Sequence, residues 1–117
     1  MIQSKIISKC IKELADFRNS LMSIENDSQY ADGYNCAVSC VKGSVQTRID
    51  SLYESLQIYD PNDKINEAYE CYNEIASLLT VLNEDCEGAD DSEFGKSFTK
   101  KINECIKQLA DIQSKYS

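Results

Sequence analysis

Apolar residues recur at spacings of three and four along four stretches of the chain, each about twenty residues long. This spacing places their side chains on one face of an α-helix. The four stripes are Ile7, Cys10, Leu14, Phe17, Leu21 and Ile24; Val38, Val41, Val45, Ile49, Leu52, Leu56 and Tyr59; Ile65, Ala68, Tyr72, Ile75, Leu79 and Leu82; and Phe98, Ile102, Cys105, Leu109, Ile112 and Tyr116. No stretch alternates apolar and polar residues as a strand does. The pattern predicts an all-α bundle of about four amphipathic helices, forming a single domain over residues 1–117.

Three turn-forming segments separate the stripes. The first, "ENDSQYADG", closes with Gly33. The second, "DPND", offers Asp60 as a helix cap and Pro61 for the first helical position. The third, "NEDCEGADDSE", offers Ser92 as the cap of the last helix. Gly43 lies inside the second stripe and predicts a bend or a close helix contact there.

The chain has six cysteines and no histidine. An even and dense set of cysteines is typical of small secreted domains that are stapled by disulfides. A zinc site would need four cysteines, but no second close pair complements Cys36 and Cys40, so we expect no metal. We therefore predict disulfides and an extracellular location, with free buried thiols as the alternative. Residues 1–20 are amphipathic, so we expect the signal peptide to be absent from this chain.

The positions of the cysteines along the helices limit how they can pair. At about 1.5 Å of rise per residue, three of them lie toward the end of the bundle that holds the termini, and three lie toward the other end. The first group is Cys10, Cys71 and Cys105, and the second is Cys36, Cys40 and Cys86. A disulfide needs Cα atoms within about 7 Å, so either two thiols stay free or one helix is bent or broken. We expect the broken helix.

The first four cysteines are separated by 25, 3 and 30 residues. This spacing resembles the first part of the six-cysteine signature of insect odorant-binding proteins. That family is secreted and all-α, and it holds small apolar molecules in an interior cavity. Its pairing scheme implies Cys10–Cys40, Cys36–Cys86 and Cys71–Cys105 in this chain. The last two cysteines depart from the family, which keeps them about two helical turns apart, whereas 18 residues separate them here.

A repeated segment offers a different pairing. "ISKCIKELADF" from Ile7 recurs as "INECIKQLADI" from Ile102, with a cysteine at the same position of each copy. A duplication would explain the repeat, but we favour convergent patterning of two core-facing helices, because helix patterning alone recruits these residue types. If the matched cysteines paired, Cys10 would bond to Cys105 and tie the terminal helices together.

Charge and composition argue against several functions. The formal net charge of -8 disfavours nucleic acids and anionic membranes as partners. The absence of histidine excludes catalytic triads and cysteine–histidine dyads, so we expect no enzyme and no cofactor. The acidic row of Glu67, Glu70 and Glu74 is interpreted as a solvated helix face. The acidic residues between 85 and 93 do not follow a calcium-loop spacing and are interpreted as a soluble surface loop.

Two sets of residues are candidates for binding. Tyrosines in the half of the bundle that holds the termini form the candidate recognition surface, or else they seal the core: Tyr53, Tyr59, Tyr69, Tyr72 and Tyr116. The walls of a ligand cavity would come from Leu14, Leu52, Ile75 and Leu109. We predict a secreted, non-enzymatic protein of salivary, venom or effector type that recognises a protein partner. The alternative is an extracellular carrier of a small hydrophobic ligand, similar to odorant-binding proteins.

Overall fold

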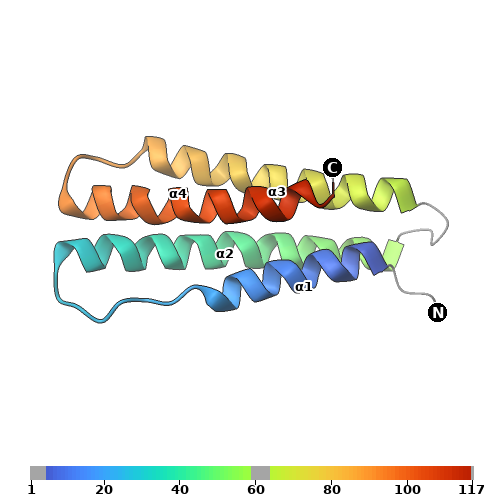
Figure 1. Cartoon of the computed structure of the whole chain (residues 1–117), viewed down its shortest axis with the longest axis horizontal. Helices are drawn as coiled ribbons and strands as arrows, with labels where there is room; N and C mark the ends of the chain where they lie inside the picture. The colour runs from blue at the N-terminus through green and yellow to red at the C-terminus, as the bar shows by residue number, and fades with distance from the viewer. Residues whose placement is uncertain (1–4, 59–63, 117) are drawn as a thin grey trace.

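Four α-helices run alternately up and down along the long axis of the molecule (Figure 1). The computed structural model describes residues 5–58 and 64–116. The helices are α1 (Lys5–Ser20), α2 (Gln29–Ile58), α3 (Lys64–Glu87) and α4 (Glu93–Ser114). Both chain termini lie at one end, and the α1–α2 and α3–α4 connections lie at the other, which we call the loop end. The predicted all-α bundle is confirmed.

No helix within the described ranges has both the length and the apolar character needed to cross a membrane.

The beginning of α2 differs from the prediction. Ser28 caps this helix, because its Oγ accepts a hydrogen bond from the Ala31 N–H at 3.1 Å. Gly33 therefore lies inside the helix and not in a turn. A Cβ at Gly33 would overlap the Phe94 carbonyl oxygen and the Ser97 Oγ, so glycine is needed here for the close approach of α2 and α4.

Gly43, in contrast, makes no close contact. A Cβ at this position would have nothing within 4 Å, and the helix continues through it without interruption. The close contact that Gly43 would allow is therefore absent there, and it occurs ten residues earlier in the same helix.

The first helix is shorter than its apolar stripe. It ends at Ser20, whose hydroxyl donates to the Phe17 carbonyl at 2.6 Å. The following segment is held by Asn35 of α2, which accepts from the Ile24 N–H at 2.8 Å and donates to the Ile24 carbonyl at 2.9 Å. Leu21 is still buried, so the apolar pattern continues past the end of the helix.

One hydrophobic core cluster takes side chains from all four helices. The predicted stripes of α1, α2 and α4 face this core over their described residues, with Ile24 half-buried. The buried face of α3 is displaced by about one residue from the prediction. Its members are Glu67, Cys71, Ile75, Leu78 and Leu82. The prediction for α3 was wrong at Tyr72, which is exposed, and it missed Leu78, which is fully buried. Tyr59 and the side chain of Ile65 lie outside the described part of the chain.

Polar side chains join α2 and α3 in the half that holds the termini. The Ser55 hydroxyl donates to Glu70 at 2.6 Å, and the Ser51 hydroxyl donates to Glu74 at 3.0 Å. Arg48 forms a 3.4 Å ion pair with Glu74. Together with the burial of Glu67, these bonds show that the acidic row of α3 is not a solvated face. It lies along the seam between two helices.

Candidate binding site

The site lies at the loop end, where α3 is followed by a short connection and then by α4. Asp90 orders this connection, because its carboxylate accepts hydrogen bonds from the Ser92 N–H at 3.1 Å and from the Ser92 hydroxyl. These hydrogen bonds lower the pKa of Asp90 below its usual value. Ser92 is the N-cap of α4, as predicted, and its Oγ accepts from the Gly95 N–H at 3.1 Å.

Gly95 lets this connection fold tightly over the first turn of α4. It is buried, and a Cβ in its place would overlap the backbone carbonyl of Asp90. A larger residue would therefore push the connection away from the helix. The loop is a packed part of the structure, not only a soluble surface segment.

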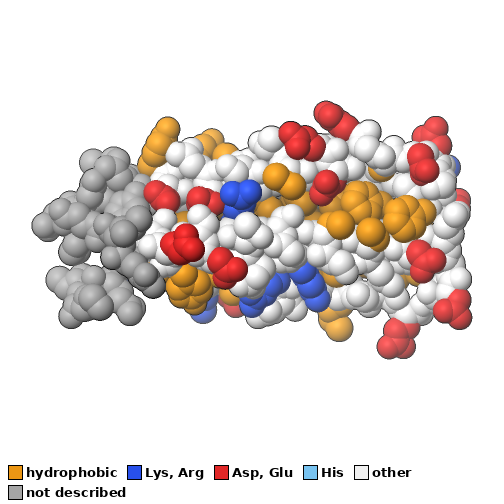
Figure 2. Space-filling model, turned by 180° about the vertical axis from the view of Figure 1, so that it is seen from behind, with side chains coloured by type: hydrophobic (Ala, Val, Ile, Leu, Met, Phe, Trp, Pro, Cys, Tyr) orange, Lys and Arg blue, Asp and Glu red, His pale blue; other side chains and the backbone are white. Residues whose placement is uncertain are grey.

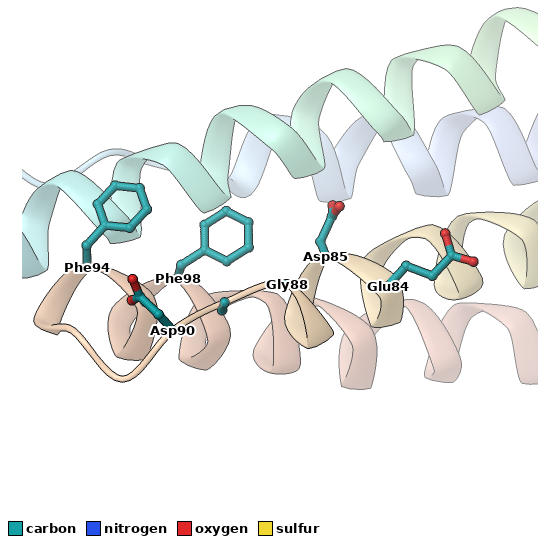
Figure 3. Close-up of a pocket in the computed structure, with 8 residues that line it drawn as sticks. Glu84, Asp85, Gly88, Asp90, Phe94 and Phe98 are labelled. Atoms are coloured by element: carbon teal, nitrogen blue, oxygen red, sulfur yellow. The ribbon is translucent and has the colours of Figure 1, made fainter.

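A pocket of about 310 Å³ lies between the end of α3 and the start of α4 (Figure 3). Two aromatic rings, one helical turn apart on α4, form its apolar part. The rings of Phe94 and Phe98 are stacked, with centroids 6.3 Å apart and planes inclined by 15°. Both project from α4 toward α2. Phe94 remains 36% exposed, whereas Phe98 packs against the core.

The remaining lining of the pocket is acidic or small. Its members are Glu84, Asp85, Gly88, Ala89, Asp90 and Gly95, and no basic residue is among them. The Asp85 carboxylate projects from α3 toward α2 (Figure 3). On the rear face, hydrophobic side chains form a strip along the loop half of the molecule, and acidic side chains surround it (Figure 2). The pocket thus combines an exposed aromatic side chain with a negative rim.

Asp85 also affects a thiol on the neighbouring helix. Burial, followed by the nearby Cys36 thiol and the Asp85 carboxylate, raises the pKa of Cys40. The thiol is therefore protonated at neutral pH and is a poor nucleophile. Within the described residues, no group of three or more cysteine, aspartate or glutamate side chains is placed to hold a metal ion.

The predicted tyrosine surface is not a single surface. Tyr69 and Tyr72 lie one turn apart on α3 and are exposed. Tyr53 is also exposed, but it is two residues from both Ser51 and Ser55, which places it on the side of α2 opposite to α3. Tyr59 lies outside the described residues.

Tyr116 belongs to the core and not to a recognition surface. It is only 9% exposed and packs in the core cluster. Burial, with further contributions from Cys10, Glu13 and Cys71, raises the pKa of its phenol. For this residue, the interpretation as a seal of the core describes the structure better than recognition does.

The four predicted cavity-lining residues are brought together, but they do not line the pocket described above. Leu14, Leu52, Ile75 and Leu109 are fully buried members of the core cluster. They come from four different helices, as an interior cavity would require. Their side chains pack in the core, and the pocket at the loop end is lined by other residues.

All six cysteines carry free thiols in the structure. Three are buried, Cys36 is exposed, and Cys40 and Cys86 are half-buried. Cys71 interacts with Cys10, Cys40 interacts with Cys36, and the Cys86 Sγ lies 3.8 Å from Asn103 Oδ1. None of these neighbours is the partner that the odorant-binding pairing scheme implies. Disulfide stapling therefore stays a prediction.

The two phenylalanines were not predicted as a pair. Phe98 was assigned to the core stripe, and Phe94 lies outside every stripe, so neither was considered for binding. A signal was present: the cap at Ser92 fixes the helix start, and an i, i+4 aromatic pair in the first turns must then share one face. Comparison with protein-family models, curated protein sequences and solved structures finds no match.

Proposed function

We propose that this protein is a secreted, non-enzymatic binding protein that recognises a partner protein through the pocket at its loop end. The observation that supports this most strongly is the stacked pair of Phe94 and Phe98 within an acidic rim. Exposed apolar side chains surrounded by polar groups are typical of interaction sites. Aromatic anchors in such pockets supply much of the binding energy of protein interfaces.

The charge of the pocket specifies the partner. Glu84, Asp85 and Asp90 line it, and the exposed Glu87, Asp91 and Glu93 are adjacent in the sequence. The partner segment should therefore present one apolar side chain flanked by lysine or arginine. The net charge of -8 would speed the encounter with such a segment, and salt would slow it.

A carrier of a small hydrophobic ligand is the second candidate, because the pocket volume of about 310 Å³ is at the lower end of known ligand sites. The acidic lining argues against fatty acids, since their carboxylates would be repelled. A ligand of this pocket would be neutral or cationic. The core residues Leu14, Leu52, Ile75 and Leu109 would then serve the fold, and Phe94 would contact the ligand.

The extracellular location and the disulfides are part of the same proposal. They are supported by the density and even number of the cysteines. If cysteines pair only with others at the same height along the bundle, the broken helix is not needed, and one cysteine of each group of three keeps a free thiol. Such a pairing is compatible with an uninterrupted α2.

A displayed library of random short peptides tests the proposal. Selection on the immobilised protein should enrich peptides with an apolar residue flanked by lysine or arginine, and their affinity should fall as salt rises. Phe94→Ala should weaken the enriched peptides by roughly 30-fold, which corresponds to an aromatic hot spot of about 2 kcal/mol. Tyr69→Ala is the matched control, because it also removes an exposed aromatic ring, from outside the pocket.

The outcomes separate the candidates. Enriched peptides without basic residues, or peptides that bind Phe94→Ala as well as the native protein, would contradict the proposed recognition site. Saturable binding of a neutral apolar dye that Phe94→Ala abolishes, without enrichment of any peptide, would instead support the carrier.

A further inference from the structure

Two buried thiols lie together where α1 meets α3. Cys10 of α1 and Cys71 of α3 are both fully buried and belong to the same core cluster. The two helices pack directly against each other. A hydrogen bond with the neighbouring Cys10 thiol, followed by burial, raises the pKa of Cys71, which places the two thiols next to each other. Neither the repeat nor the odorant-binding resemblance pairs these two residues.

The position of the two cysteines along the bundle also agrees with a bond between them. Both lie toward the end that holds the termini, each in the first half of its helix. The remaining cysteine of that group, Cys105, is buried on α4. Cys71 is the cysteine whose contact with Cys10 the structure shows.

We propose that Cys10 and Cys71 form a disulfide that ties α1 to α3. The inference rests on the oxidising compartment proposed above, and it replaces the pairs Cys10–Cys40 and Cys71–Cys105. The bond would hold α1, the shortest of the four helices, against α3; α1 is followed by a non-helical segment. It needs no bent or broken helix.

The chemistry is thiol–disulfide exchange with a small disulfide oxidant such as oxidised glutathione. One thiolate attacks the oxidant, forms a mixed disulfide and releases the first glutathione thiolate. The second cysteine thiolate attacks the mixed disulfide at the protein sulfur and releases the second glutathione thiolate. The two cysteine protons end on the two glutathione thiols, so two thiols are oxidised and one disulfide is reduced.

Burial determines when this exchange can occur. The hydrogen bond from the neighbouring thiol and burial raise the pKa of Cys71, so little thiolate is present in the folded protein. Oxidation should therefore be slow in the native state and fast during folding, before α1 has packed. Once formed, the bond should resist reductants until the protein unfolds, because the same burial excludes them.

Peptide mapping without reduction tests the pairing directly. The protein is refolded in a glutathione buffer, alkylated, and cleaved with trypsin and then with a glutamate-specific protease. Trypsin releases Cys10–Lys12, and the second protease releases Cys71–Glu74, which separates Cys71 from Cys86. We expect these two fragments joined by one disulfide. A bond from either fragment to the fragments of Cys40 or Cys105 would overturn the inference, and so would free Cys10 and Cys71 after oxidative refolding.

Two further measurements test the inference. In the reduced native protein, Cys36 should be alkylated more than roughly tenfold faster than Cys10 or Cys71, because Cys36 is exposed and the other two are buried. Reductant should lower the melting temperature of the oxidised protein, and Cys10→Ala should shrink that fall by more than Cys36→Ala does. A Cys36→Ala protein that loses as much of this fall as Cys10→Ala would contradict the inference.

The pairing and the proposed function fail in different ways. If the linked fragments form in the glutathione buffer but protein isolated from its natural source has six free thiols, the pairing stands and the extracellular location is wrong. If the natural protein carries other bonds, the pairing is wrong, and the peptide selection on the loop-end pocket still tests recognition.

Discussion

Replacing Gly33 by alanine tests the packing that brings α2 and α4 together beside the pocket. No described glycine has a positive φ angle, so the residue is required for space and not for backbone conformation. A Cβ at this position would overlap the backbone carbonyl group of Phe94 and the Ser97 Oγ. Because the obstacle includes backbone atoms, a side-chain rotation cannot remove it, and the two helices must move apart.

The magnitude follows from two opposing terms. Overpacking of a close contact costs typically 1–3 kcal/mol, and about 1 kcal/mol of helix propensity is gained when alanine replaces glycine inside a helix. Because the overlap includes backbone atoms, the upper part of this cost, about 2–3 kcal/mol, applies, and we expect a net loss of roughly 1–2 kcal/mol for Gly33→Ala. Gly43→Ala is the matched control, because it makes the same change in the same helix where a Cβ meets nothing within 4 Å. It should stabilise the protein by about 0.5–1 kcal/mol.

The assay is equilibrium unfolding in urea, followed by far-ultraviolet circular dichroism, for the native protein and the two variants. The free energies of unfolding should differ in sign between Gly33→Ala and Gly43→Ala, with similar urea dependence. If Gly33→Ala is as stable as the native protein or more stable, α2 and α4 do not approach closely there, and the geometry beside the pocket is wrong.

Two other predictions concern the site and the core. Ser92→Ala should lower the free energy of unfolding by about 1 kcal/mol through loss of the cap. It should also raise the pKa of Asp90 toward its usual value, which a carboxyl NMR titration measures. Ser77→Ala, on the exposed face of α3, is the control and should leave that pKa unchanged. Burial raises the pKa of Cys105 from 9.0 to about 11. The contribution of its protonated thiol to the free energy of unfolding is therefore fully present below pH 9 and is lost as pH rises through 11. Urea unfolding at each pH should show the native protein losing up to about 3 kcal/mol more than Cys105→Val over this range; equal losses would contradict the assigned burial.

The fold was predictable where one apolar stripe dominates a helix. In α1, α2 and α4 the predicted stripe is apolar at every turn, with one cysteine each in α1 and α4, so the spacing identifies the buried side. In α3 the buried side begins with Glu67 and Cys71, while Tyr72 and Leu79 offered a stripe of similar quality one residue away. Hydrophobic patterning predicts that a tyrosine faces the core and a glutamate faces solvent, whereas here Tyr72 is exposed and Glu67 is buried.

The candidate site was not predictable in the same way. Its acidic loop looked like a solvated connection, because sequence alone does not show that Asp90 binds Ser92 or that Gly95 allows the loop to pack on the helix. The prediction of one tyrosine surface failed for a geometric reason. Tyr53 lies at about the height of Tyr72, between the Ser51–Glu74 and Ser55–Glu70 contacts, but on a different side of the bundle. Height along a bundle follows from residue number, whereas the facing side depends on packing.

An NMR titration with the most enriched peptide tests the central claim most directly, because glycine amides lie both in the pocket and outside it. Gly88 and Gly95 line the pocket, whereas Gly43 lies exposed on α2 outside it. We predict that the amide signals of Gly88 and Gly95 shift in proportion to bound peptide, that Gly43 stays in place, and that Phe94→Ala removes the shifts. Shifts that leave Gly88 and Gly95 unchanged and appear instead at Tyr69 and Tyr72 would contradict the account.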